Sequence, residues 1–317
     1  MAFNKFQKML LGIAIGDAYG AGYEFIEKNG LSLRNEFNFT KYQSHPNPKH
    51  NHQSGMYTDD TQMSIGVCEL LLSDKEFNSQ NLADNFVNCY KRDQIVGYSS
   101  RFQDFLDSIN SGSEMLERLN PSSKRNGAAM RSVPLGLIED KKMLMDYATV
   151  NAKLTHNTPQ AIASSISVAL LSNLYLNDKE SYINVFDYVL PFVQDFPIFH
   201  SYLQEVSKLT KDSDLSILLN KDNPKLGVPC NAMKTTGAVM YILNNYQVLS
   251  DVLKESVLLG GDTDSVASIS LGIAAMNLSL EELPEFCLQD LTNHKFGKEY
   301  LIELGRKLDG KFGMLNL

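Results

Sequence analysis

The chain contains no tryptophan, and its 317 residues include only four cysteines. No two of these cysteines form a CxxC pair, and a chain of this length can bury a core without covalent cross-links. The spacing therefore argues against a disulfide framework, and three of the cysteines lie in apolar helical patterns that predict buried free thiols. The four residues are Cys68, Cys89, Cys230 and Cys287.

Positive charge and long apolar runs are also scarce. Lys and Arg together number 29 against 37 Asp and Glu, which gives a net charge of −8. Binding to a nucleic-acid backbone depends on clustered positive charge, so this composition argues against strong nucleic-acid binding. No apolar run reaches the length of a membrane span, and the N-terminus lacks a signal-peptide cleavage pattern. We expect a cytoplasmic protein with no membrane partner.

Helical periodicity, in contrast, is present along most of the chain. Apolar residues recur with a period near 3.6 in seven segments, whereas alternating, strand-like runs are scarce. No interdomain linker or internal repeat is evident, so the pattern predicts an all-α fold with residues 1–317 in a single domain. The seven segments are 4–20, 61–73, 160–176, 234–246, 249–259, 265–277 and 297–308.

Two long stretches lack this periodicity. Residues 34–57 contain His45, His50 and His52, but their spacing matches no zinc site, and we interpret the stretch as a loop. Residues 108–126 are rich in Asn, Ser and Gly and predict a second interruption between helices.

Two acidic clusters, Thr58–Thr61 (TDDT) and Asp262–Ser265 (DTDS), lie where loops turn into helices. Their ligand atoms are all oxygens, which suits Mg²⁺, Mn²⁺ or Ca²⁺ rather than zinc. The alternative for either cluster alone is helix capping. Capping needs one acid or hydroxyl, however, and each cluster carries four such residues. Two clusters of this kind in one chain favour a metal site shared between them.

The segment GDAYGAGYE supplies a third candidate element. Small residues at positions 12, 14, 16, 18 and 20 would let another helix approach closely and would bury Asp17. Glu24 follows where the helix gives way to a Gly-rich chain. It is either an ordinary surface glutamate or a general base that orients water beside the metals.

Two further segments give weaker signals. In NGAAMR, residues 126–131, backbone amides at a helix start could meet a phosphate, although an ordinary helix-start turn is the commoner interpretation. Arg131 is a candidate ion-pair partner for Asp17 or another buried acid. In THNTP, His156 precedes an apolar helix, and a single histidine there is more often structural or capping than catalytic.

These segments occur in the order and spacing of the ADP-ribosylglycohydrolase superfamily, also called ADP-ribosyl-acceptor hydrolases. The chain resembles this family over about residues 5–280, on TDDT…GGDTDS, GDAYGAGYE and NGAAMR. The resemblance implies a compact, single-domain, orthogonal multi-helix bundle. It also implies a central cleft that holds two Mg²⁺ ions, with Mn²⁺ as the alternative metal.

The resemblance further implies roles for individual residues. Glu24, Asp60 and Asp264 would be catalytic, with Glu24 orienting or deprotonating water. The predicted substrate-binding residues are Asn126 and Gly127 near the diphosphate, His156 near the nucleotide, and Ser123 and Tyr98. The predicted metal ligands are Thr58, Asp59, Asp60, Asp262, Asp264 and Ser265.

Three local features depart from common family patterns. Ser265 stands where many members carry threonine, which keeps a hydroxyl ligand. Residues 122–125 (SSKR) replace Gly-rich sequence, so a contact of Lys124 or Arg125 with the diphosphate is left open. Residues 97–100 (GYSS) are closer to serine-type hydrolases than to the dinitrogenase-reductase type.

The implied activity is Mg²⁺-dependent hydrolysis of the glycosidic bond at C1″ of ADP-ribose, attached to a protein side chain or a small acceptor. We expect a monomer. Two alternatives stay open. One is a non-catalytic ADP-ribose- or nucleotide-binding member of the same family, and the other is a metal-dependent phosphohydrolase. The sequence does not select the acceptor.

Overall fold

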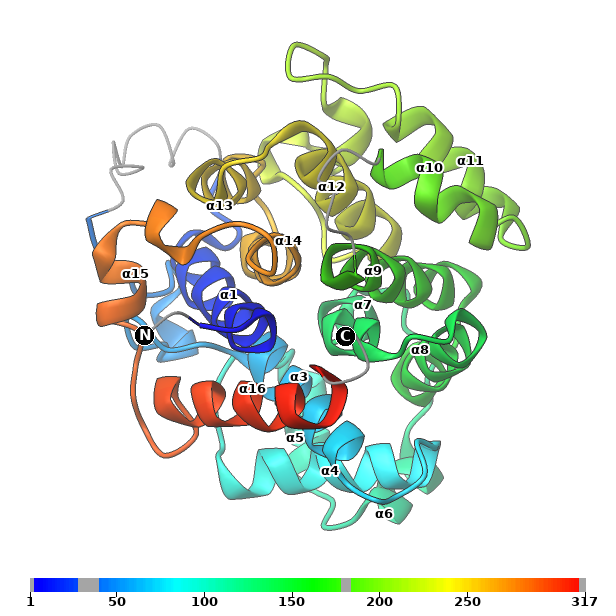
Figure 1. Cartoon of the computed structure of the whole chain (residues 1–317), viewed down its shortest axis with the longest axis vertical. Helices are drawn as coiled ribbons and strands as arrows, with labels where there is room; N and C mark the ends of the chain where they lie inside the picture. The colour runs from blue at the N-terminus through cyan, green and yellow to red at the C-terminus, as the bar shows by residue number, and fades with distance from the viewer. Residues whose placement is uncertain (1–2, 28–39, 178–183, 314–317) are drawn as a thin grey trace.

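The computed structural model describes residues 3–27, 40–177 and 184–313. These residues form α-helices and short 3-10 turns and contain no β-strand (Figure 1). Their strand-like pairings are two isolated bridges, an antiparallel one between Ser122 and His156 and a parallel one between Val228 and Gly261. The prediction of an all-α fold is therefore confirmed.

All seven helices expected from periodicity are present, with ends within a few residues of the predicted ones. The helices are α1 Lys5–Gly20, α3 Asp59–Leu72, α4 Ser79–Arg92, α5 Ser100–Asp107, α6 Gly112–Arg118, α7 Gly127–Met130, α8 Lys141–Thr155, α9 Pro159–Asn177, α10 Val185–Val189, α11 Pro197–Val206, α12 Ala232–Asn245, α13 Leu249–Leu258, α14 Thr263–Ala274, α15 Glu285–Gln289 and α16 Lys298–Phe312.

The two stretches predicted to be irregular differ in outcome. In the first, residues 34–39 lie outside the described residues, and 40–57 contain one short 3-10 turn, Pro48–His50. The prediction of an interruption over 108–126 was wrong in part, because α6 lies within it. The Ser111 side chain accepts a hydrogen bond from the backbone N–H of Glu114, so a residue interpreted as part of a turn caps a helix instead.

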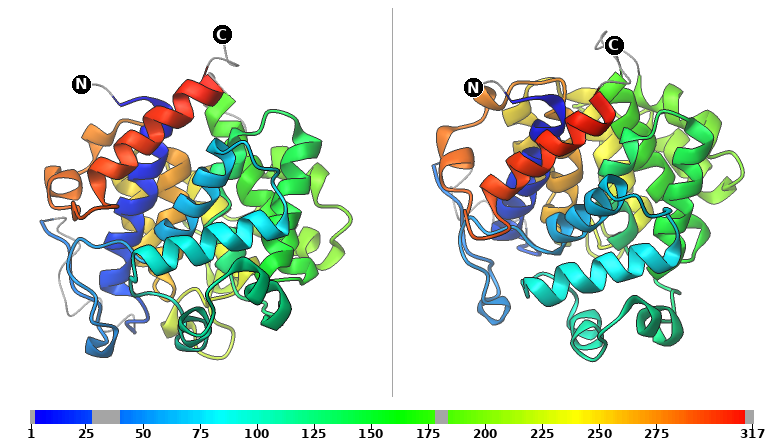
Figure 2. Two further views of the ribbon diagram at one scale, coloured as in Figure 1. Left: turned by 90° about the horizontal axis from the view of Figure 1, so that it is seen from below. Right: turned by 60° about the horizontal axis from the view of Figure 1, so that its bottom comes forward.

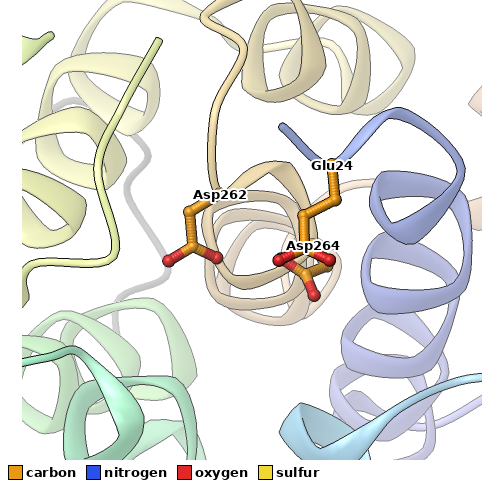
Figure 3. A group of neighbouring side chains, drawn as sticks. All are labelled: Glu24, Asp262 and Asp264. Carbon is orange, nitrogen blue, oxygen red and sulfur yellow. The ribbon is translucent and has the colours of Figure 1, made fainter. Parts of the chain in front are cut away.

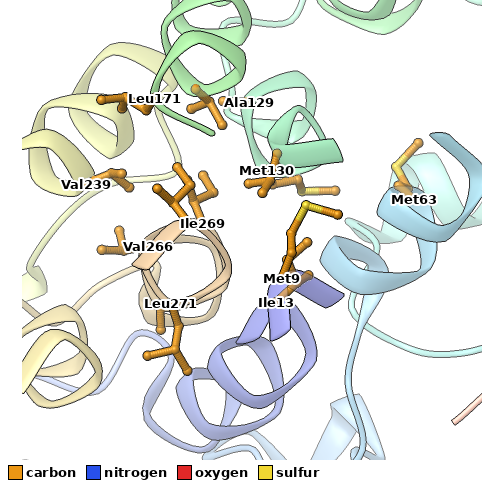
Figure 4. Packing of buried hydrophobic residues seen from close by; sticks show 14 of the residues in the cluster. Met9, Ile13, Met63, Ala129, Met130, Leu171, Val239, Val266, Ile269 and Leu271 are labelled. Atoms are coloured by element: carbon orange, nitrogen blue, oxygen red, sulfur yellow. The ribbon is translucent and has the colours of Figure 1, made fainter. Parts of the chain in front are cut away.

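Helix α14 lies at the centre of the fold, with α1, α13, α12 and α9 around it (Figure 1). All twelve of its residues are buried. Figure 4 shows Val266, Ile269 and Leu271 of α14 among apolar side chains from α1, α7, α9 and α12. Burial of α14 follows from its small and apolar sequence, which offers no face suited to water.

Glycines on α1 allow its backbone to approach α14. A Cβ added at Gly12 would lie 2.6 Å from the carbonyl oxygen of Leu271, and one at Gly16 would lie 2.3 Å from that of Ala267. Contacts this short do not occur in folded proteins, so only glycine fits. Figure 2 shows α1 beside α14, with α16 crossing the N-terminal half of α1. The contact places the end of α1 beside the start of α14, where the acidic residues lie.

This contact yields a stability prediction. Gly16→Ala is expected to lower the free energy of unfolding by about 2 kcal/mol or more, because the added methyl would overlap the Ala267 carbonyl and force α1 and α14 apart. Gly310→Ala in α16 is the matched control, since nothing lies within 4 Å of the added Cβ. It should be neutral or stabilising, as alanine favours helix. Urea denaturation of both variants decides the matter, and equal midpoints would contradict the prediction.

All four cysteines are free, and Cys68, Cys89 and Cys287 are buried, as predicted. Within the described ranges, no helix combines the length and apolar character that crossing a membrane requires. The assignment of residues 1–317 to one domain stays a prediction.

Candidate metal centre and active site

The N-cap side chains of the two acidic clusters do not cap their helices. Thr58 is the N-cap residue of α3 and Asp262 is the N-cap residue of α14, yet neither side chain makes a capping hydrogen bond. The Thr58 hydroxyl donates instead to Asp17 of α1, at 2.7 Å. In the second cluster, Asp264 accepts from the backbone N–H of Ser265 at 2.8 Å, so one acid stabilises the first turn of α14. The N-cap residues Thr58 and Asp262 do not have this role.

Asp17 attaches the start of α3 to α1. Its carboxylate accepts four donor groups from Thr58 and Thr61. The backbone N–H of Thr58 lies 2.9 Å from Oδ1 and the hydroxyl of Thr58 2.7 Å from Oδ1. The backbone N–H and hydroxyl of Thr61 lie 3.0 and 2.6 Å from Oδ2. Asp17 is buried, as the sequence indicated, and it fixes the position of the first acidic cluster.

The glycine pair before the second cluster shapes the turn that presents Asp262. Gly260 and Gly261 have φ values of 70° and 81°, which favour glycine. A Cβ on Gly261 would lie 2.0 Å from the carbonyl oxygen of Val228. The backbone N–H of Phe25 donates to the Gly261 carbonyl at 2.7 Å, so the chain that carries Glu24 is attached to this same turn.

Three carboxylates converge at the start of α14. Glu24, Asp262 and Asp264 each offer an oxygen, and these atoms lie within 4.8 Å of one another. Figure 3 shows Glu24 extending from the chain after α1 toward Asp264, with Asp262 at the head of the same helix. The first cluster adjoins them, because α1 contacts both helix starts: Asp17 accepts from the Thr58 hydroxyl at 2.7 Å, and the Gly20 carbonyl accepts from the Thr263 hydroxyl at 2.7 Å. The structure thus brings residues of both clusters together.

The carboxylates of this centre are largely buried and repel one another, which favours the binding of positive charge. Burial, followed by the charges of Asp262 and Asp17, raises the pKa of Glu24 to about 8. Burial is also the main cause that raises the pKa values of Asp59, Asp60 and Asp264 well above their usual range. Among the described residues, no Lys or Arg pairs with these four carboxylates.

The donor set fits a hard divalent cation. Oδ1 of Asp60 is buried and has no hydrogen-bond partner within the described chain. A buried acceptor of this kind is costly unless a cation or donor meets it. Carboxylate and hydroxyl oxygens are the ligands that Mg²⁺ and Mn²⁺ prefer. Metal binding by the six predicted ligands stays a prediction.

Asn126 contacts a predicted metal ligand directly. Its side-chain Nδ2 donates to Oδ2 of Asp262 at 2.8 Å and to the hydroxyl of Thr235 at 3.0 Å. The Asn126 side chain is therefore engaged in orienting Asp262, which the sequence did not indicate. The next residue, Gly127, lies under the ring of His156, since an added Cβ would lie 2.8 Å from its Cε1. Diphosphate contact by these residues stays a prediction.

The candidate ion pair of Arg131 with Asp17 or another buried acid is not formed among the described residues. The guanidinium is buried and donates to Oδ1 of Asn151 at 2.7 Å and to the Thr155 hydroxyl at 2.7 Å. It also lies over the ring of Phe86, with its Cζ 4.6 Å from the ring centroid. Asp17 has already satisfied its oxygens with threonine donors, and neutral acceptors on α8 serve Arg131 instead. Burial lowers the pKa of Arg131 to about 9, which leaves it charged at neutral pH.

Arg131 also determines the state of His156. The Thr155 hydroxyl accepts from Arg131 and lies 2.6 Å from Nδ1 of His156. The opposite side of the imidazole ring lies beside Gly127. Burial, followed by the charge of Arg131, lowers the pKa of His156 to about 3. His156 is therefore neutral at neutral pH, and its contact with a nucleotide stays a prediction.

The remaining predicted substrate residues lie in two loops. Tyr98 is buried, and its hydroxyl donates to Oε1 of Gln62 on α3 at 2.7 Å. The Ser123 hydroxyl accepts from the backbone N–H of Arg125 at 3.2 Å. The Lys124 carbonyl accepts from the backbone N–H of Ala232 at 3.1 Å, which attaches this loop to α12. Substrate contact by Tyr98 and Ser123 stays a prediction.

Two residues near the centre were missed by sequence reasoning. His45, interpreted only as part of a loop, places Nε2 2.7 Å from Oε2 of Glu24. Burial, followed by the charge of Asp262, raises the pKa of the Cys230 thiol, so it stays protonated. No periodicity or motif marks either position, because each reaches the centre through a loop whose path depends on the rest of the fold.

The predicted cleft at the acidic centre stays a prediction. A pocket of about 360 Å³ lies elsewhere, and none of its lining residues is a predicted site residue. They are Ser216, Ile217, Leu219, Asn220, Lys221, Pro224 and Lys234.

Together these features define a class: an all-α protein in which two helix starts present buried carboxylates to one oxygen-donor centre. The sequence profile of the ADP-ribosylglycohydrolase family matches residues 2–315, and the chain belongs to this family.

Relatives along the whole chain agree with this assignment. ADP-ribosylhydrolase ARH3 of Xenopus tropicalis is 25% identical over 89% of this chain and 89% of its own. ADP-ribosylarginine hydrolase Tri1 of Serratia proteamaculans (strain 568) is 21% identical over 93% of this chain and 77% of its own. A solved structure described as an ADP-ribosylglycohydrolase-related protein complex matches with a TM-score of 0.69 and 22% identity, covering 96% of each chain. The sequences support ADP-ribosyl hydrolase activity, and the solved structure shows the fold.

Proposed function

We propose that this protein hydrolyses the glycosidic bond at C1″ of ADP-ribose that is attached to a protein side chain or a small acceptor. The observation that carries the proposal is the convergence of Glu24, Asp262 and Asp264 within 4.8 Å, in a chain of this family. A carboxyl of raised pKa beside an oxygen-rich centre is the arrangement that water-dependent glycosidic cleavage requires.

The acidic centre would hold two Mg²⁺ ions, or Mn²⁺ in their place. When bound, these cations would supply the positive charge that balances the carboxylates and polarises oxygens of the sugar. The unpartnered Oδ1 of Asp60 and the absence of a Lys or Arg partner among the described residues support this assignment. The residues that would hold the ions are Thr58, Asp59, Asp60, Asp262, Asp264 and Ser265.

Glu24 is the residue that would move the proton. As the bond between C1″ and the acceptor atom breaks, the sugar develops oxocarbenium character, and a water oxygen bonds to C1″. The Glu24 carboxylate accepts a proton from this water and relays it to the acceptor atom, which keeps the electron pair of the broken bond and leaves protonated. Its place at the centre suits Glu24 to this role, because one of its oxygens lies within 4.8 Å of oxygens of Asp262 and Asp264.

Product analysis tests the proposal. A panel of substrates ADP-ribosylated on arginine, on serine, on nucleic-acid ends and as O-acetyl-ADP-ribose is incubated with the protein, with and without Mg²⁺. We expect free ADP-ribose from at least one substrate, and only with the metal. AMP or phosphate would instead indicate a phosphohydrolase. Calorimetric binding of ADP-ribose without turnover of any substrate would indicate a binding protein.

The raised pKa of Glu24 predicts how pH affects the metal-free protein. Between about pH 7 and about pH 8, histidines are neutral in both states, and the unfolded chain has ionised its glutamates. The folded state still holds a proton on Glu24, whose pKa is about 8. Because the folded state binds more protons, its free energy of unfolding should fall as pH rises.

Added Mg²⁺ should reverse this trend, since cation binding displaces the same protons. The measurement is thermal denaturation across this interval, in EDTA and in Mg²⁺. Metal-free stability that rises with pH, or Mg²⁺ stabilisation that weakens with pH, would contradict the prediction.

A further inference from the structure

The loop before α3 places a histidine side chain against the carboxylate of Glu24. His45 lies within residues 40–57, and its Nε2 is 2.7 Å from Oε2 of Glu24. Both side chains are largely covered, with 7% of His45 and 15% of Glu24 exposed. A short hydrogen bond shielded from water holds its partners more firmly than an exposed one does. The contact therefore constrains the carboxylate assigned to proton transfer.

Neighbouring groups determine which nitrogen of His45 carries the proton. The backbone N–H of Asn47 lies 2.9 Å from Nδ1 of His45. A backbone N–H can only donate, so Nδ1 is an acceptor and the ring hydrogen of the neutral imidazole is on Nε2. His45 is thus a donor to Oε2 of Glu24. The ring of His50 stacks on that of His45 at 4.1 Å with an interplanar angle of 8°.

We propose that His45 is a positioning residue that holds Oε2 of Glu24 and leaves Oε1 to take the proton of the attacking water. This inference rests on the proposed function. Repulsion from Asp262 and Asp264 would otherwise turn the Glu24 side chain away from the centre. A neutral N–H donor counters that displacement without cancelling the negative charge, whereas Lys or Arg in its place would form an ion pair and weaken the base.

Two substitutions separate the hydrogen bond from the packing of the ring. His45→Phe keeps an aromatic ring against His50 but removes the donor to Glu24. His45→Gln removes the ring and keeps an N–H donor. We expect His45→Phe to lower kcat by about tenfold to a hundredfold with KM changed by less than about twofold, because orientation of a reacting group acts mainly on the chemical step. His45→Gln should restore most of kcat.

His50→Gln is the matched control. It removes the stacked ring and leaves the contact between His45 and Glu24 in place, so its kcat should stay within about twofold of the wild type. The proposal is overturned if His45→Phe matches the wild type, or if His45→Phe and His45→Gln are equally impaired. The second result would mean that the ring, and not its donor, is what the site needs.

A spectroscopic measurement on the substrate-free protein tests the contact independently of turnover. Long-range ¹H–¹⁵N spectra of histidine-labelled protein distinguish the two tautomers, and the signals of His45 are assigned by their loss in His45→Gln. We expect a protonated Nε2, and a protonated Nδ1 would overturn the proposal. If wild-type protein releases no ADP-ribose from any substrate, the proposed function is refuted but the hydrogen bond from His45 to Glu24 is not. The tautomer measurement still tests that hydrogen bond.

Discussion

Replacement of Asp262 by asparagine is expected to reduce kcat for release of ADP-ribose by about a thousandfold or more, which is the scale of losing a charged group that stabilises a transition state. Asp262 lies with Glu24 and Asp264 at the centre, and its replacement removes one of the three negative charges that would bind the cations there. Asparagine keeps the shape of the side chain and an oxygen for the 2.8 Å contact from Asn126. The loss would therefore reflect charge and not collapse of the turn.

The same substitution should act in the opposite direction on the stability of the metal-free protein. Removal of one negative charge relieves the repulsion that raises the pKa values of Glu24 and Asp264. Asp262→Asn should therefore unfold at a higher temperature than the wild type in EDTA and gain less from Mg²⁺. Asp222→Asn, on an exposed residue, makes the same change in charge and should alter neither property.

Two outcomes would contradict this account. The first is Mg²⁺-dependent activity near the wild-type level in the double variant Asp60→Ala, Asp262→Ala, which would refute the assignment of these acids to a metal centre. The second is an Asp262→Asn variant that unfolds in EDTA at a clearly lower temperature than the wild type. Its loss of activity would then follow from unfolding, and the carboxylate would serve mainly to stabilise the fold. Activity and denaturation measured on the same preparations distinguish the two.

Local patterns predicted the helices well, because periodicity depends on residues that are close in sequence. The 3.6-residue spacing located α1, α9 and α14 to within a few residues. The stripe of small residues on α1 also indicated a close helix neighbour, which the contacts of Gly12 and Gly16 bear out. Neither feature required knowledge of distant parts of the chain.

The partners of individual polar groups were less predictable, since they depend on tertiary contacts. Charge alone suggested that Arg131 would pair with an acid, but buried neutral oxygens of Asn151 and Thr155 surround it instead. The hydrogen bond from Asn126 to Asp262 joins residues 136 positions apart. His45 lies in an aperiodic loop, and only the folded path of that loop brings it to Glu24.

Removal of the Asp17 carboxylate should have the largest effect on stability. Asp17→Ala leaves four buried donors of Thr58 and Thr61 without their acceptor, and we expect it to lower the free energy of unfolding by about 3–5 kcal/mol. Two of these donors are backbone N–H groups, which cannot turn to find another partner. Asp222→Ala on the surface is the control and should stay within about 0.5 kcal/mol of the wild type.

Variants that remove different numbers of these hydrogen bonds test whether their loss causes the destabilisation. Thr61→Val removes only the hydroxyl that lies 2.6 Å from Oδ2 of Asp17, and it should cost about 1 kcal/mol. Asp17→Asn should fall between Thr61→Val and Asp17→Ala, because its NH₂ group would face a backbone N–H that can only donate. Denaturant titration gives the three values, and an Asp17→Ala loss no larger than that of Thr61→Val would refute the prediction. Because Asp17 positions the start of α3, the variants that still fold should also lose Mg²⁺-dependent stabilisation in the same order.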